Sequence, residues 1–315
     1  MTLARSLTAL GLLALLAGGA ACAAAPAPAA PGRAEPPAQR GRLSDYVLIV
    51  SLDGLRPDAI ARTRARTLQR LLREGSHSLT AQTILPSRTL PGHMSMLSGK
   101  EPQAHRVLHN DDPDETRWTV DVPTVFRLAH EHGFETVAFF SKKKFRQLYE
   151  PHTVAHATHP TGWLGQRTAE ITASRVERHL RSARPQLVFV HFAEPDNFGH
   201  LFGWMSGPYR RAVEYADVRL ARILAAADRA YGPGNYTVLV SADHGGHRFT
   251  HGSDHPLDTT IPWLAWGRGV RAGTTLPDGI RITDTAATAL WLLGIPIPER
   301  WVGRPVRAAF AADPP

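Results

Sequence analysis

Short runs of apolar and β-branched residues alternate with helix-like segments from residue 46 onward. The runs predict strands over 46–52, 136–140, 187–192, 237–241 and 261–266. Helical spacing of apolar residues, or a proline at the start of the segment, predicts helices over 57–73, 168–180, 209–231 and 284–293. Strands that alternate with helices form a mainly parallel sheet covered by helices. We therefore expect an α/β fold, a three-layer αβα sandwich, in a single domain over residues 45–312.

The first 22 residues have the pattern of a secretory signal peptide. Arg5 supplies a positive charge, residues 9–17 are apolar, and residues 18–25 are mostly small. The apolar stretch is shorter than the roughly 20 residues that span a bilayer. Residues 23–44 form an Ala/Pro-rich segment without periodicity, which predicts a disordered tether. The chain is therefore predicted to be exported, to the periplasm or out of the cell.

Cys22 is the only cysteine of the chain, so no intramolecular disulfide is available. Its place at the end of the leader resembles the acylated cysteine of bacterial lipoproteins. Those proteins usually carry Leu or another larger apolar residue where this chain has Gly19. Two alternatives follow, a lipid anchor to a membrane through Cys22 or plain cleavage near Ala21 or Ala23.

The formal net charge is +8, and it comes from arginines spread along the chain. Such a charge gives either a solvated basic surface or a field that attracts anionic substrates. The sequence contains no nucleic-acid-binding motif and no regular interleaving of basic and aromatic residues. Nucleic acid is therefore not implied as a partner.

Carboxylates and histidines gather where the predicted strands end, which is where α/β folds bind their ligands. This set consists of Asp53, Asp196, His200, Asp243, His244 and His251. Carboxylate and imidazole donors suit Zn²⁺, with Mn²⁺ or Fe as alternatives. Asp243 and His244 are adjacent, so at a strand end each can reach a different ion. The sequence therefore favours two divalent metal ions over one.

A hydroxyl group precedes a predicted helix in the segment Pro86 to His93. Pro91 suits the first turn of that helix, which places Thr89 at its N-terminus. Backbone N–H groups and the helix dipole favour an anion or a phosphate at such a position. A threonine hydroxyl there becomes a nucleophile when a metal ion lowers its pKa.

The order and spacing of these segments resemble the nucleotide pyrophosphatase/phosphodiesterase family of the alkaline phosphatase superfamily, over residues 45–307. The resemblance implies an alkaline-phosphatase-like fold and a hydrolase acting on small phosphate esters or nucleotides, with Thr89 as the nucleophile that forms a phosphothreonine. It also implies two metal sites: Asp53, Thr89, Asp243 and His244 form one, and Asp196, His200 and His251 form the other. Asn110 matches the asparagine that binds a phosphate oxygen in this family.

Three departures from the family pattern concern substrate binding. His191 stands where the family has a tyrosine platform for a nucleobase, and Arg106 brings a cation where the family commonly has glycine. The chain also lacks the larger insertions that shape substrate pockets in many relatives, so specificity stays open. Near the last motif, His247 is the alternative ligand to His251, while His255 and Asp258 are candidates to orient the ligands.

Several functions remain as alternatives to the phosphodiesterase. A phosphomonoesterase would need an added cation for its dianionic substrate, for which Arg88 or Arg106 are candidates. A phosphoryl transferase would use the same residues, and a metal-binding exported protein without turnover would keep the fold alone. A sulfatase is disfavoured, because Ile84 occupies the position of the modified nucleophile.

Overall fold

The structure is a computed structural model that describes residues 41–111, 122–159 and 168–311. The predicted signal peptide, including Cys22, and most of the predicted tether lie outside the described residues. The predicted tether over 23–44 includes two residues that contact the fold. The backbone N–H groups of Leu43 and Ser44 donate hydrogen bonds to Leu292 O. These two residues are therefore part of the folded unit.

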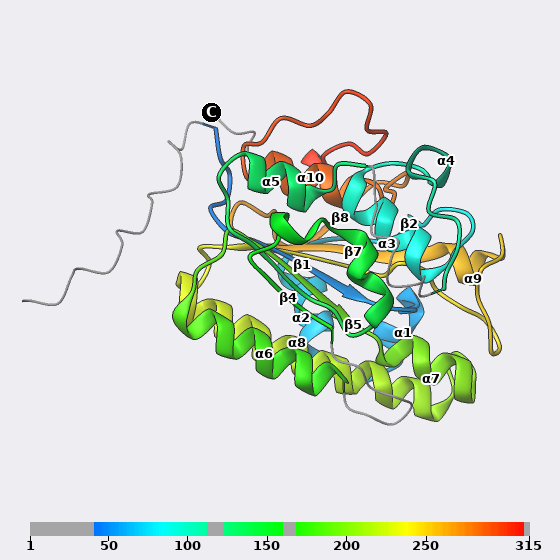
Figure 1. Cartoon of the computed structure of the whole chain (residues 1–315). Helices are drawn as coiled ribbons and strands as arrows, with labels where there is room; N and C mark the ends of the chain where they lie inside the picture. Colours follow the sequence, from blue (N-terminus) through cyan, green and yellow to red (C-terminus); the bar gives the residue numbers. More distant parts are fainter. Residues whose placement is uncertain (1–40, 112–121, 160–167, 312–315) are drawn as a thin grey trace, which may run out of the picture. The chain divides into compact units, whose positions relative to one another are not determined.

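Within the described residues, eight strands form one sheet in the order β4-β3-β5-β1-β6-β7-β2-β8 (Figure 1). Neighbouring strands are parallel except at β7, which is antiparallel to both β6 and β2. The strands are β1 (Val47–Leu52), β2 (Ser76–Gln82), β3 (Thr136–Phe139), β4 (His156–Thr158), β5 (Leu187–Phe192), β6 (Thr237–Ser241), β7 (Thr260–Gly267) and β8 (Thr274–Thr275). The predicted mainly parallel sheet is confirmed.

Helices cover both faces of this sheet. Figure 1 shows α3, α5 and α10 on one face and α6, α7 and α8 on the other, so the three-layer αβα arrangement is confirmed. The helices are α1 (Pro57–Ala61), α2 (Arg66–Glu74), α3 (Thr89–Ser98), α4 (Pro102–His105), α5 (Val125–Glu131), α6 (Thr168–Ser182), α7 (Glu194–Phe202), α8 (Gly207–Tyr231), α9 (Pro256–Thr259) and α10 (Asp284–Leu292), with 3₁₀ helices η1 (Lys143–Leu148), η2 (Pro151–Thr153) and η3 (Arg307–Ala309). None of these helices is long and apolar enough to cross a membrane.

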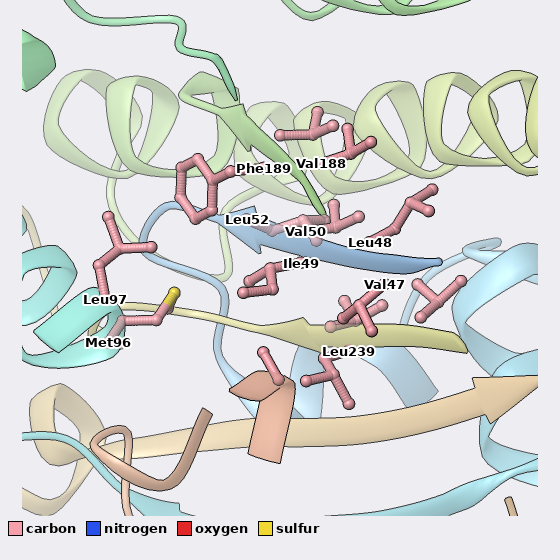
Figure 2. Close-up of a cluster of buried hydrophobic side chains, with 14 of the residues drawn as sticks. Val47, Leu48, Ile49, Val50, Leu52, Met96, Leu97, Val188, Phe189 and Leu239 are labelled. Atoms are coloured by element: carbon pink, nitrogen blue, oxygen red, sulfur yellow. The ribbon is translucent and has the colours of Figure 1, made fainter. Parts of the chain in front are cut away.

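The core lies around the central strands. All six residues of β1 are buried, as expected for a parallel strand covered on both faces. Figure 2 shows β1 side chains beside Val188 and Phe189 of β5 and Leu239 of β6, with Met96 and Leu97 arriving from α3. Since α3 begins at Thr89, its packing here fixes the candidate nucleophile above the ends of β1 and β6.

The predicted helix over 57–73 is two helices, α1 and α2, with a break between them. The carboxylate of Asp217 on α8 accepts hydrogen bonds from Thr67 N at 3.0 Å and Leu68 N at 2.7 Å. It thereby satisfies the first N–H groups of α2, which otherwise lack partners. A cap supplied by another helix 150 residues away in sequence leaves no local signal.

No helix or strand is predicted over 103–121 or 141–166. The described portions of these segments contain the end of α4, both η1 and η2, and the edge strand β4. Strand β2 was also missed, since its sequence is polar and its pairing with β7 shifts register between Ser78 and Ala81. Short or irregular elements of this kind carry no periodic pattern over enough residues to be detected.

Candidate active site

Asp53 and Asp243 lie at the carboxyl ends of the neighbouring strands β1 and β6, and both are wholly buried. Gly54 turns the chain away with a φ of +69°, and its N–H donates to Asp243 Oδ1 at 3.1 Å. A Cβ atom at Gly54 would stand 3.0 Å from Asp196 Cα. The glycine therefore supplies both the left-handed turn and the close approach of the three carboxylates.

Asp196 and His200 lie on helix α7, a helix that is not predicted and that begins soon after β5 ends. Pro195 occupies the first turn of this helix, where its missing N–H is harmless. The two residues are four apart and share one face, with His200 Nε2 at 3.3 Å from Asp196 Oδ1. Asp196 is buried, whereas the His200 side chain is 45% exposed, so this part of the site borders solvent.

The three predicted histidine ligands are held in the same way. Each donates a hydrogen bond from Nδ1 to a main-chain carbonyl: His244 to Gly245 O at 2.8 Å, His200 to Phe249 O at 3.0 Å and His251 to Ser87 O at 2.8 Å. A carbonyl oxygen only accepts, so Nδ1 carries a proton in each ring, and Nε2 is the nitrogen that has a lone pair when the ring is neutral. Three imidazoles thus turn Nε2 toward the same set of carboxylates.

Three buried carboxylate oxygens of the site have no hydrogen-bond partner: Asp53 Oδ1, Asp196 Oδ1 and Asp243 Oδ2. His244 Nε2 lies 3.4 Å from Asp53 Oδ1 and 3.2 Å from Asp243 Oδ2, and His251 Nε2 lies 3.5 Å from Asp196 Oδ1. Lone pairs facing buried carboxylates are unfavourable without a cation between them. The donor set therefore fits divalent metal ions.

Two groups of residues have ligand atoms close enough for an ion. Asp196, His200 and His251 form one group, and Asp53, Asp196 and His244 form the other, with all ligand atoms in each group within 4.8 Å of one another. The first group is the one predicted. In the second, Asp196 takes part beside Asp53 and His244, so the two groups share a carboxylate.

Thr89 is the first residue of α3 and is buried beside these groups, with its Oγ1 at 3.4 Å from His244 Nε2. His93, one turn later, donates from Nδ1 to Thr89 O at 2.8 Å, and its Nε2 is bonded to the Ser51 hydroxyl at 2.8 Å. A Cβ atom at Gly92 would lie 2.8 Å from Asp243 O. The start of α3 is therefore pressed against the end of β6, which fixes the threonine hydroxyl among the ligands.

Lys142 is a site residue that the sequence pattern did not reveal. Its Nζ lies 2.7 Å from both Asp53 Oδ2 and Asp196 Oδ2. Burial alone would raise the pKa of Asp53, but the ammonium and a hydrogen bond from His191 hold it well below its usual range. The pKa of Lys142 is raised, since both carboxylates outweigh burial. The available signal was its position just after a predicted strand.

Asn110 lies against the start of α3. Its Oδ1 accepts from Leu90 N at 3.0 Å and from Lys144 Nζ at 2.9 Å, and its main-chain oxygen accepts from the same Nζ at 3.0 Å. Burial and the Lys142 ammonium lower the pKa of Lys144 to about 8, against the attraction of the three site carboxylates. Lys144, like Lys142, lies in a segment for which no helix or strand is predicted, and no sequence pattern identified it as a site residue.

The three residues predicted to bind substrate are placed differently. Arg88 and Arg106 are exposed, and the Arg88 side chain lies against Gly252. His191 is wholly buried: its Nε2 donates to Asp53 Oδ2 at 2.9 Å and its Nδ1 accepts from Ser141 N at 3.2 Å. The His191 ring therefore faces inward and supports Asp53, so the structure offers no aromatic platform at this position.

A third group of possible ligands lies beside the loop that carries His251. His247 donates from Nδ1 to the buried Asp258 carboxylate at 2.6 Å, and its ring stacks on His255 at 4.3 Å between centroids. Asp258 also accepts from the Ser253 hydroxyl, and His255 Nδ1 accepts from Leu257 N. These bonds fasten the loop from 247 to 258, in keeping with the predicted orienting role.

Comparisons with known proteins give a consistent result. Residues 47–266 match the family model described as type I phosphodiesterase / nucleotide pyrophosphatase. The chain is 23% identical over 214 residues to a venom phosphodiesterase from Macrovipera lebetinus, covering 63% of this chain and 25% of that protein. It is 24% identical over 278 residues to GPI ethanolamine phosphate transferase 1 from Aspergillus oryzae, covering 75% and 26%. The chain thus spans about a quarter of the length of these relatives.

Solved structures share the fold. Murine ectonucleotide pyrophosphatase / phosphodiesterase 5, an inactive variant in complex with AMP, superimposes with a TM-score of 0.72 at 14% identity, over 85% of this chain and 100% of that one. A 2-O GAG sulfatase gives a TM-score of 0.68 at 16% identity, over 84% and 74%. The predicted alkaline-phosphatase-like fold is confirmed.

Proposed function

The chain belongs to the type I phosphodiesterase / nucleotide pyrophosphatase family, and we propose that it hydrolyses phosphate diesters or pyrophosphates with two divalent metal ions and a phosphothreonine intermediate. One observation carries this proposal. Three buried carboxylate oxygens without partners face three imidazole Nε2 atoms, and one of these atoms, His244 Nε2, lies 3.4 Å from the Thr89 hydroxyl at the start of a helix.

The residues present fit the two predicted ions. Asp53, Thr89, Asp243 and His244 would hold one, and Asp196, His200 and His251 the other. Zn²⁺ suits this set of oxygen and nitrogen donors best, with Mn²⁺ or Fe as alternatives. When bound, such ions supply positive charge that lowers the pKa of a hydroxyl and stabilises a departing oxygen.

The residues of the chain then perform a two-step displacement. Thr89 Oγ1, after losing its proton to solvent, attacks phosphorus in line; an O–P bond forms and the bond to the leaving alkoxide breaks. The alkoxide takes a proton from water. The Asn110 amide N–H and the positive end of the α3 dipole beside Thr89 hold the equatorial oxygens, because positioning and charge stabilisation dominate phosphoryl transfer. Water then attacks the phosphothreonine and restores the hydroxyl.

A phosphoryl transferase is the second candidate. The similarity to GPI ethanolamine phosphate transferase 1 favours it. The same phosphothreonine would form, and an alcohol in place of water would accept the phosphoryl group. Product analysis in the presence of added alcohols distinguishes the two functions.

We also keep export as part of the proposal, with Cys22 as the site of a lipid anchor or a residue near the cleavage point. The leader-like pattern of the first 22 residues supports it. Cell fractionation together with mass spectrometry of the mature N-terminus tests both statements.

Hydrolysis of bis(p-nitrophenyl) phosphate compared with p-nitrophenyl phosphate tests the proposed reaction. The protein is measured loaded with Zn²⁺ or Mn²⁺ and again after chelation. We expect diester hydrolysis that a chelator abolishes and added metal restores. Turnover that survives complete metal removal would overturn the two-metal proposal.

A further inference from the structure

Lys144 is a partly buried cation beside the site that has no carboxylate partner among the described residues. Its Nζ bonds only to two neutral acceptors, the side-chain and main-chain oxygens of Asn110. Lys142, two residues earlier, is in contrast paired with both Asp53 and Asp196. A sheltered ammonium without a counter-charge is unfavourable by itself and gains strongly from an anion.

The position of Lys144 is fixed by its own short helix. Phe145, the next residue of η1, is wholly buried, and its ring lies 4.5 Å from that of His93 and 4.3 Å from that of His191. Those two histidines in turn support Thr89 and Asp53. The ammonium is therefore anchored to the same framework as the nucleophile and the ligands.

Lys144 also sets the direction of the Asn110 amide. Leu90 N–H and the Lys144 ammonium both donate to Oδ1, so this atom must be the oxygen of the amide. The Nδ2 donor is left without a protein acceptor among the described residues. Because Leu90 follows Thr89 directly, the free amide donor and the ammonium lie together at the place where phosphate oxygens would bind.

We propose that Lys144 binds the additional negative charge of a dianionic phosphoryl group, so that the site hydrolyses phosphate monoesters as well as diesters. This inference rests on the proposed function and deepens it. A bound diester carries one negative charge on phosphorus, whereas a monoester carries close to two above a pH of about 6. The sequence assigned the added cation to Arg88 or Arg106; the structure places both at the surface and Lys144 beside Asn110.

Substitution of Lys144→Met removes the charge and keeps the side-chain length. We expect kcat/KM for p-nitrophenyl phosphate to fall roughly 10- to 100-fold, the range for a lost charge-assisted hydrogen bond, and that for bis(p-nitrophenyl) phosphate to fall less than about 3-fold. Lys144→Arg should restore most of the monoester rate. Lys143→Met, an exposed neighbour with the same change in net charge, should leave both rates within about 2-fold.

A purely positioning role makes a different prediction. If Lys144 acted only by holding Asn110, then Lys144→Met would lower kcat/KM for the monoester and the diester by the same factor. Asn110→Ala should likewise lower both values equally. Equal losses, or no loss on the monoester, would overturn the inference.

Binding of inorganic phosphate to the metal-loaded protein gives a readout independent of turnover. Calorimetry should show phosphate affinity weakened roughly 10-fold or more by Lys144→Met, with dimethyl phosphate affinity unchanged. If the wild type hydrolysed neither ester but still bound phosphate more tightly than Lys144→Met does, that result would refute the proposed hydrolysis but support the anion site at Lys144. Equal phosphate affinity in both proteins would refute the anion site itself.

Discussion

The imidazole rings of His244 and His251 are stacked, with centroids 3.6 Å apart and planes 12° apart. Two imidazolium ions cannot occupy such positions without strong repulsion. Burial, and then the neighbouring His244, lower the pKa of His251 to about 4. The His251 ring is thus held in the neutral form, which is the form that binds a metal ion.

Substitution of His251→Ala should remove one of two bound metal ions. His251 belongs to the group with Asp196 and His200, and two remaining ligands hold an ion poorly. Metal content after gel filtration, measured by mass spectrometry, should fall from two equivalents per chain to about one. His255→Ala removes an exposed ring from the neighbouring group of His247, His255 and Asp258, and this variant should retain both ions. Loss of an ion in this variant would instead indicate that His247 is the ligand in place of His251.

Thr89→Ala should abolish turnover while the protein stays folded. The hydroxyl is the only proposed nucleophile, and losses of about 10³-fold or more are expected when such a group is deleted. Thr89→Ser should keep part of the activity because it retains a hydroxyl. Steady-state rates on the diester, with circular dichroism as a control for folding, check this; substantial turnover by the alanine variant would disprove the assignment.

Removal of Lys142 should destabilise the metal-free protein selectively. Lys142→Met leaves the buried carboxylates of Asp53 and Asp196 without their ammonium, which costs about 3 kcal/mol in the free energy of unfolding. Bound metal ions would neutralise the same carboxylates, so the loss should be smaller in the loaded protein. Urea unfolding with and without chelator measures both values. Equal losses in the two states would show that Lys142 does not share these carboxylates with a metal.

The stability of the protein should decline in mild acid through His105. Its side chain is buried, accepts from Val107 N at 3.1 Å and bonds the Ser95 hydroxyl at 2.9 Å. Burial lowers its pKa from 6.5 to about 4, so protonation favours the unfolded chain. The stabilisation is present above pH 6.5 and is lost as pH falls toward 4.

Urea unfolding at pH 7 and pH 5 tests this. Between pH 7 and pH 5 the free energy of unfolding of the wild type should fall by about 2 kcal/mol more than that of His105→Gln. His132→Gln, which replaces an exposed histidine, should follow the wild type. A pH profile that is unchanged in the His105 variant would contradict the assignment.

The strands and the acidic ligands were predictable because a buried strand requires a continuous run of apolar residues in the sequence. A parallel strand such as β1 is apolar throughout, and the residue that ends the pattern, Asp53, stands at the sheet edge. The same holds for β6 and Asp243. The sheet order was not predictable, since it depends on pairing between segments far apart, as when β1 lies between β5 and β6.

The positions of Lys142, Lys144 and the His191 ring could not be predicted from the sequence. Lys142 and Lys144 reach the site because β3 lies beside β5 and η1 folds back over α3, and neither contact has a periodic signature. A strand residue can face either layer, so the sequence alone does not show where the His191 ring points. Only the register of β5 against β1, which pairs His191 with Ser51, shows that it supports Asp53 from within.

The bonds from the three imidazoles to carbonyl oxygens have a kinetic consequence. Phe249 O, Ser87 O and Gly245 O orient the rings before any ion arrives, so their rotational freedom is already lost when the chain folds. Uptake of a metal would then require dehydration of the ion, but no search among ring orientations. Because the carbonyls come from segments on either side of the sheet edge, the binding centre exists only in the completely folded protein, and the bound metal reports on that state.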